Sequence, residues 1–192
     1  MAERLHVHPV NPQSRLVDKA AAVLKAGGLA LAPTDAGYAL VWALESKAAE
    51  ERVQRLRELD SKHPFTLLCR QLSEAGRLAR LDDPAFRLMR SLTPGPCTFI
   101  LPASADLPKR IKNSGRSKRR DIGIRLPDHV VTRALLEAWP DAAAATGASV
   151  AQMQEEGHSR LAGPLLAVAA ALINLSINVA RLSVRVAIST GP

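Results

Sequence analysis

The sequence feature that most constrains the fold is residues 27–40, which read GGLALAPTDAGYAL. An apolar run leads into Pro33, then into the polar pair Thr34 and Asp35, and then into a glycine and Tyr38. This order predicts a short strand ending in a turn, where proline fixes φ and glycine lets a backbone approach a ligand closely. Two interpretations follow: an ordinary structural turn, or a turn that gathers a hydroxyl, a carboxylate and a phenol at a ligand.

Apolar runs that suit strands alternate with amphipathic stretches that suit helices across the first 138 residues. Strands are predicted at residues 29–32, 41–44, 65–69, 97–101 and 122–126. Helices are predicted at residues 14–26, 46–59, 73–79, 83–92 and 127–138. The alternation indicates an α/β domain with a mixed or parallel sheet. In the fourth helix, Phe86, Met89 and Leu92 are expected to be buried.

The composition bounds the class of protein. A chain of 192 residues favours one domain, and its 3% of aromatic residues predicts a core of small aliphatic side chains. The net charge of +8 indicates an anionic partner such as a nucleotide, RNA or a membrane surface. The same charge is compatible with a genome that simply favours arginine.

The cysteines and the N-terminus indicate a cytoplasmic protein. Cys69 and Cys97 lie in apolar runs without metal-binding spacing, which favours free buried thiols and no metal site. The first ten residues contain no apolar signal-peptide core. Residues 161–180 carry no charge and are long enough to span a membrane, but a Gly-Pro pair and scattered polar residues interrupt them. We therefore expect no membrane association.

Two arginines and a histidine stand out as candidate ligand-binding residues. Arg57 ends a predicted helix, and His63 lies in the polar loop that follows, before a predicted strand. Together these positions favour contact with an anion. Arg125 sits within a predicted strand, on the opposite face from Ile124 and Leu126. A charge there is costly unless it is paired, so Arg125 is either a surface residue on an edge strand or part of a cleft.

Residues 109–120, KRIKNSGRSKRR, are the main concentration of positive charge. Such a cluster attracts phosphates, and its lack of aromatic residues argues against base stacking. Contact with RNA or a nucleotide and a plain solvated loop both remain open. The candidate RNA-binding residues are Lys109, Arg110, Lys112, Arg116, Lys118, Arg119 and Arg120.

Four blocks occur in a characteristic order: PTDAGYAL, RELDSKHPFTLLC, LTPGPCTFIL and IGIRLPDH. No GxGxxG, P-loop or GxSxG motif accompanies them. In this order the blocks resemble the YrdC-like family, which includes the threonylcarbamoyl-AMP synthases, and their wording is most similar to its YciO-type branch. The resemblance covers roughly residues 14–138 and implies a twisted mixed sheet with flanking helices and a basic concave cleft.

The resemblance also implies an activity and its partners. Enzymes of this family condense threonine, bicarbonate and ATP into threonylcarbamoyl-AMP and pyrophosphate, for modification of adenosine 37 in tRNA. Mg²⁺ is expected with ATP, although no metal ligand and no catalytic residue can be named from the sequence. Binding of tRNA or double-stranded RNA is expected as well. The alternative is a non-catalytic YrdC-like protein that binds RNA or a nucleotide.

Site residues carry over from the matching blocks. Thr34 and Tyr38 would line the threonine and adenylate pocket, and the turn beginning at Thr93 would border it. Arg125 would face the nucleotide or the threonyl carboxylate, because an intermediate carrying carboxylate and phosphate needs fixed guanidinium groups. The expected substrate- and nucleotide-binding set is Thr34, Tyr38, Arg57, His63, Thr93 and Arg125.

The chain also departs from the family pattern. Arg57 replaces the lysine of a KxR block and Leu59 replaces its arginine, which removes a phosphate donor. His63 aligns with the asparagine of an NPL segment. A Ser-x-Asn element is due after residue 138, where only Thr146 or Ser149 could stand in. We therefore divide the chain into a YrdC-like domain, 1–140, and a divergent alanine-rich segment, 141–192. A reading-frame change is our favoured hypothesis for that segment, and a divergent C-terminus is the alternative.

Overall fold

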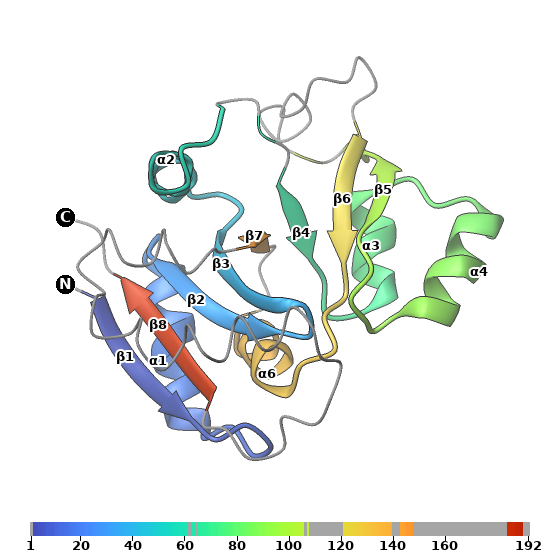
Figure 1. The fold of residues 1–192 in the computed structure, drawn as a ribbon. Coiled ribbons are helices and arrows are strands. Elements are labelled where there is room, and N and C mark those ends of the chain that lie inside the picture. The colour runs from blue at the N-terminus through green and yellow to red at the C-terminus, as the bar shows by residue number, and fades with distance from the viewer. Residues whose placement is uncertain are drawn as a thin grey trace.

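The computed structural model describes residues 2–60, 63, 65–105, 107, 121–139, 143–147 and 184–189. Its strands are β1 (Ala2–Val7), β2 (Leu29–Thr34), β3 (Gly37–Ala43), β4 (Thr66–Leu68), β5 (Phe99–Pro102), β6 (Asp121–Arg125), β7 (Ala143–Gly147) and β8 (Val184–Ser189). Its helices are α1 (Ser14–Lys25), α2 (Lys47–Leu56), α3 (Leu72–Leu78), α4 (Asp83–Leu92) and α6 (Val130–Ala138). Figure 1 shows their arrangement.

The strands form one mixed sheet in the order β1-β8-β2-β3-β7-β4-β6-β5. β4 and β6 run parallel, and the other paired strands run antiparallel. The predicted α/β fold with a mixed sheet and flanking helices is therefore confirmed. The basic cleft stays a prediction, because residues 109–120 lie outside the described part of the chain.

The stretch at residues 27–40 forms a continuous hairpin rather than two short separate strands. β2 and β3 stay paired up to Thr34 and Gly37, so only Asp35 and Ala36 form the turn. Gly37 has a φ of +104°, a backbone conformation that glycine adopts without the strain of a Cβ. The hairpin therefore presents Asp35 at its tip, at the end of two hydrogen-bonded strands.

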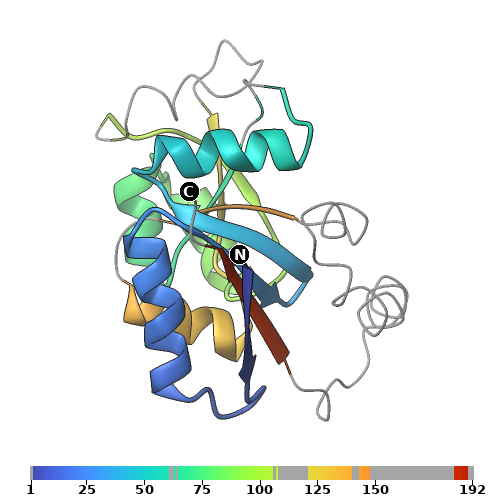
Figure 2. The ribbon, with the colours of Figure 1, turned by 90° about the vertical axis from the view of Figure 1, so that its left-hand side faces the viewer.

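The core lies on both sides of the sheet. One cluster joins β1, β2 and β3 to α1 and α6, which lie side by side in Figure 2. The other joins β3, β4 and β6 to α2 and α3. As predicted, the buried residues are mostly small and aliphatic. The exceptions include Trp42, whose ring meets Phe65 edge to face with centroids 4.9 Å apart. Sites on the sheet are thus supported from both faces.

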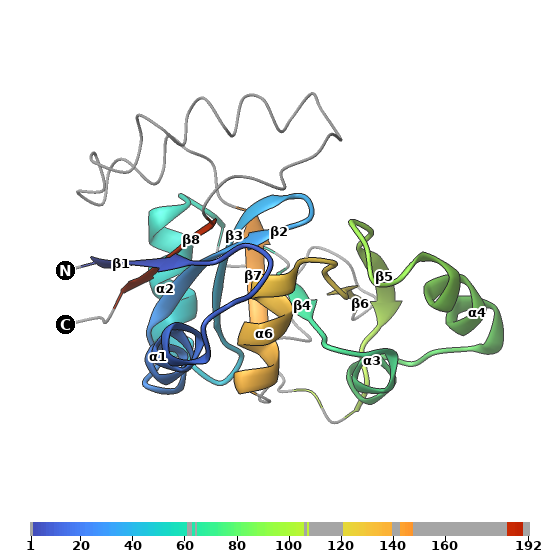
Figure 3. The same ribbon diagram turned by 90° about the horizontal axis from the view of Figure 1, so that it is seen from below.

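The prediction for the buried face of α4 is wrong at two positions. Met89 is fully buried, but Phe86 and Leu92 are 42% and 45% exposed. α4 lies at the outer end of the molecule, beside the edge strand β5, so little of the chain covers it (Figure 3). Its N-cap is Asp82, whose carboxylate accepts from the backbone N–H of Ala85 at 2.8 Å.

Two strands from beyond residue 140 belong to the same sheet. β7 lies between β3 and β4, and β8 lies between β1 and β2. The proposed division of the chain at residue 140 stays a prediction. Residues 161–180 lie outside the described residues. None of the helices in the described ranges combines the length and apolar character that a membrane span requires.

Candidate functional site

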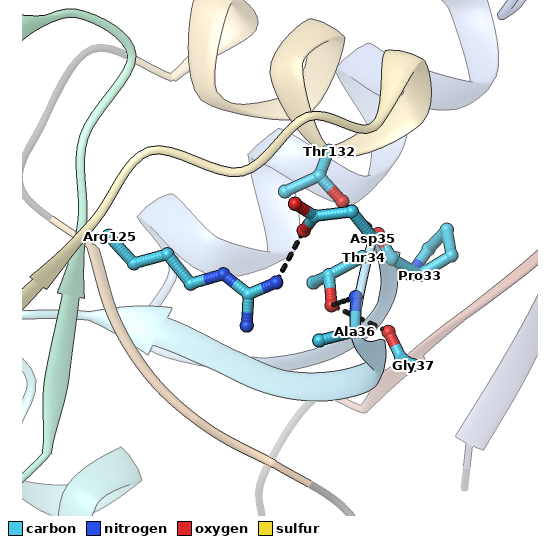
Figure 4. A network of polar contacts seen from close by, with 7 residues as sticks. All are labelled: Pro33, Thr34, Asp35, Ala36, Gly37, Arg125 and Thr132. Atoms are coloured by element: carbon cyan, nitrogen blue, oxygen red, sulfur yellow. Dashed lines mark hydrogen bonds and ion pairs between the residues drawn. The ribbon is translucent and has the colours of Figure 1, made fainter. Parts of the chain in front are cut away.

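The hairpin turn is held by its own threonine. The Thr34 hydroxyl donates to the Gly37 carbonyl at 2.7 Å and accepts from the Ala36 N–H at 3.2 Å (Figure 4). These bonds fix the backbone on either side of Asp35. The hydroxyl that was predicted to contact a ligand therefore has a structural role in the turn itself.

Arg125 reaches the turn from the end of β6 and forms an ion pair with Asp35 through its Nη2 atom (Figure 4). The two residues are 90 positions apart in the chain. Their side chains are only 14% and 13% exposed, so the pair is largely shielded from water. β6 lies inside the sheet and β5 forms its edge, so the edge-strand interpretation of Arg125 is wrong. Its neighbour Ile124 is fully buried, as expected if the two side chains leave opposite faces of β6.

Helix α6 anchors the turn from the other side. The Thr132 hydroxyl, which is fully buried, donates to the Pro33 carbonyl. His129, at the N-cap of α6, is close enough to sense Asp35 electrostatically. Burial lowers the pKa of His129, and the negative charges of Asp35 and Asp128 partly oppose that effect. His129 is therefore held toward its neutral form beside a charged pair.

Three buried atoms of this cluster have no hydrogen-bond partner within the part of the chain that the structure describes. They are Oδ2 of Asp35, Nε of Arg125 and Nδ1 of His129. Buried polar atoms are nearly always paired, so a set without partners requires an explanation such as a bound ligand or water. We call Asp35, Arg125, His129 and Thr132 the turn cluster.

The turn that begins at Thr93 lies against the end of β6. The Gly95 N–H donates to the carbonyl of Leu126, the residue after Arg125, at 2.9 Å. The Thr93 hydroxyl donates to the Met89 carbonyl at 2.7 Å and so caps the end of α4. The predicted proximity of this turn to Arg125 in the backbone is thus present, while the Thr93 side chain is directed to its own helix.

Arg57 and His63 meet at the end of α2. Arg57 is the C-cap residue, and the His63 N–H closes the following loop by donating to the Asp60 carbonyl at 2.8 Å. Burial lowers the pKa of Arg57. Burial and the positive charge of Arg57 lower the pKa of His63, and Asp60 acts in the opposite direction. Arg57 and His63 are therefore close enough to interact electrostatically, and their predicted contact with an anion stays a prediction.

Thr34 and Tyr38 were both predicted to line the ligand pocket, but they lie on different faces of the hairpin. Tyr38 pairs with Pro33 across the hairpin, whereas Thr34 pairs with Gly37. Because successive residues of a strand point to opposite faces, the phenol of Tyr38 and the hydroxyl of Thr34 leave opposite faces of the hairpin. A ligand that touches both must reach around the tip, where Asp35 lies.

The binding set expected from the sequence left out three members of the turn cluster, Asp35, His129 and Thr132, although the carboxylate of Asp35 was part of the ligand interpretation of the turn. A signal existed for Asp35, because an arginine inside a buried strand requires a carboxylate partner and Asp35 lies in the first block. His129 belongs to the same block as Arg125. Among the described residues, no group of three or more His, Cys, Asp and Glu side chains could hold a metal ion. The predicted RNA-binding residues lie outside the described ranges.

Comparison with known proteins identifies relatives along most of the chain. A family model named Sua5_yciO_yrdC, with the description "Telomere recombination", matches residues 22–162. The uncharacterized protein YciO of Escherichia coli is 44% identical over 138 residues, which cover 72% of this chain and 66% of the relative. This chain therefore spans just under two thirds of that protein's length. A threonylcarbamoyl-AMP synthase of Alkalilimnicola ehrlichii is 31% identical over 133 residues, covering 69% of this chain and 67% of the relative.

Solved structures agree with the sequence matches. The crystal structure of E. coli YciO superimposes with a TM-score of 0.68 at 44% identity, covering 73% of this chain and 66% of that one. Sua5 of P. abyssi, solved in complex with L-threonine, gives a TM-score of 0.65 at 22% identity, covering 71% of this chain and 39% of that one. The likeness to Sua5 shows the shared fold.

Proposed function

The chain belongs to the Sua5/YciO/YrdC family, and we propose that it is a threonylcarbamoyl-AMP synthase-type enzyme that condenses threonine, bicarbonate and ATP. The family includes synthases at about 30% identity to this chain. The more similar YciO relatives carry no activity in their names, so the proposal rests on the site as well as on kinship.

One observation in the site carries the proposal: the largely buried guanidinium of Arg125, fixed at the turn of the PTDAGYAL block. A fixed guanidinium offers hydrogen-bond donors in a planar fork that matches carboxylate and phosphate oxygens. Only Nη2 is committed to Asp35, and Nε has no partner within the described residues. The group can therefore still donate to an anionic ligand.

The proposed chemistry suits such a site. The amine of threonine adds to bicarbonate with loss of water, and an oxygen of the resulting carbamate attacks the α-phosphate of ATP. A carbamate–phosphate bond forms as the bond to pyrophosphate breaks. Such a displacement depends mainly on positioning and charge stabilisation. Mg²⁺ would accompany the phosphates of ATP and offset their negative charge.

The test is pyrophosphate release by the full chain with threonine, bicarbonate and ATP. We expect release that requires all three, and a loss of at least about 10-fold in kcat/KM for Arg125→Lys, because lysine cannot reproduce the planar fork. The matched control is Arg90→Lys on exposed α4, which should match the wild type. Release at background level in the folded wild-type protein would overturn the proposal.

A second function, non-catalytic binding of RNA or a nucleotide, is favoured by one observation at the end of α2. Leu59, which replaces the family's arginine, packs against the core cluster and presents no donor. In this alternative, background pyrophosphate release would accompany RNA binding that weakens steeply with salt, because phosphate contacts release counterions. Binding that ignores salt would count against it.

A further inference from the structure

We propose that Asp35 is a positioning residue, which acts through Arg125 by fixing the direction in which the guanidinium donates to an anionic ligand. The inference deepens the proposed function and rests on it for the nature of the ligand. It assigns a role to a carboxylate that would otherwise count only as the neutralising partner of a buried charge.

The geometry of the Arg125–Asp35 ion pair differs from that of a bidentate pair. A purely stabilising arginine–carboxylate pair is commonly bidentate, with two parallel N–H···O bonds. Here the contact joins Nη2 to Oδ1, while Nε of Arg125 and Oδ2 of Asp35 have no partner among the described residues. In Figure 4 the second terminal nitrogen of Arg125 points away from Asp35. The Asp35 carboxylate thus restrains one terminal nitrogen of the guanidinium and leaves other N–H groups of Arg125 to donate to a ligand.

Asp35 itself is held firmly in place. The Thr34 hydroxyl closes the turn by donating one hydrogen bond and accepting another, and the buried Thr132 hydroxyl of α6 donates to the Pro33 carbonyl just before it. Asp35 is therefore fixed from both its own hairpin and a distant helix. A group that is itself immobile can position another, because little conformational freedom is left to lose when the ligand binds.

The turn cluster carries a cost in folding stability. Within the described residues, three buried atoms at Asp35, Arg125 and His129 have no partner, and a buried polar atom without a partner costs stability because it forfeits its bonds to water. A bidentate arginine–carboxylate pair would give more of these atoms a partner and so avoid much of that loss of stability. A bound ligand, or a water that accompanies it, would supply the missing hydrogen-bond partners. Arg125 is the member of the turn cluster that can donate to an anion.

The direct test observes Arg125 without any ligand. In ¹⁵N spectra of the arginine side chains, assigned through Arg125→Gln, we expect two separate Nη signals for wild-type Arg125, because Asp35 hinders rotation of the guanidinium. In Asp35→Asn the two signals should merge. Averaged Nη signals in the wild type would overturn the proposal whatever the protein binds.

The functional test is a double-mutant cycle on binding, measured by calorimetry with threonine and with inorganic pyrophosphate as probes. We expect Asp35→Asn to weaken the Arg125-dependent binding by about 10-fold. In the Arg125→Gln background the same change should alter binding by less than about twofold, because the effect passes through Arg125. Effects that simply add in the double mutant would refute a positioning role.

A third variant separates positioning from stability. Asp35→Glu keeps the charge and moves the carboxylate by one methylene, so we expect near-normal stability with weakened binding. Unchanged binding in Asp35→Glu would contradict the proposal, and so would Arg125→Gln binding both probes as the wild type does. The matched control is Glu3→Gln, which removes an exposed carboxylate from Lys19 and should leave binding unchanged. Failure of the proposed function is seen separately, as absent pyrophosphate release.

Discussion

Arg125 and Arg57 were both predicted to bind an anion, and the fold treats them differently. Arg125 is positioned by tertiary contacts, since its partner Asp35 lies 90 residues away and is itself clamped by α6. The backbone of Arg57 is fixed locally, as the C-cap of α2 before the loop that holds Asp60 and His63. The difference teaches that the turn cluster depends on the whole sheet being formed, whereas the end of α2 depends mainly on its own helix and loop.

The largest expected effect tests whether the turn cluster is a tertiary device. Asp35→Asn leaves the charge of Arg125 largely buried and unpaired, so the free energy of unfolding should fall by about 3 kcal/mol. Urea denaturation measures this change. The control is Glu3→Gln, because the Glu3–Lys19 pair is about half exposed and should contribute less than about 1 kcal/mol. Equal losses in the two variants would erase the distinction between buried and exposed pairs.

A smaller effect is expected at the clamp from α6. Thr132→Val keeps the shape of the side chain but removes the hydroxyl that donates to the Pro33 carbonyl, so that a buried carbonyl loses its partner. The free energy of unfolding should fall by about 1–2 kcal/mol in the same denaturation experiment. Thr132→Ser retains the hydroxyl, so it should keep the bond and lose only a methyl contact. If the valine variant is as stable as the wild type, α6 does not clamp the turn.

The smallest expected effect concerns the end of α2, where Arg57 influences the pKa of His63. Arg57→Gln removes a positive charge that disfavours protonation of His63, so the pKa of His63 should rise toward its ordinary value. Proton NMR titration of the His63 ring measures the change. Arg55→Gln, at an exposed position of the same helix, should leave that pKa unchanged. A shift of the same size in both variants would mean that the helix charge as a whole, rather than Arg57, acts on His63.

Much of the fold followed from local sequence. The first helix was predicted to end at residue 26, and Gly27, just beyond α1, takes a positive φ that is typical of a helix end. The strand carrying Arg125 was placed within one residue, because its apolar neighbours alternate with it. The failure at Phe86 and Leu92 has a physical cause: an apolar stripe shows which face could be buried, but only the fold shows whether another element covers it.

The candidate site was predicted less completely. The four blocks identified Arg125 and the hairpin turn, since each block forms one local piece of structure. They did not identify Asp35 as the partner or Thr132 as the clamp, because those contacts join residues 90 and 99 positions apart. Whether two residues that far apart in the chain come together depends on the order of the strands in the sheet. Local periodicity does not encode that order.

The sequence by itself determined the family, the helices, five of the eight described strands, and Arg125 as a charged residue near a strand end. Only the tertiary structure decided which of those residues meet. It buried Arg125 against Asp35, turned the Thr34 hydroxyl into the turn and separated it from the phenol of Tyr38. The physical reason is that backbone patterning fixes each side chain's direction relative to its own strand, while pairing between strands decides what lies opposite.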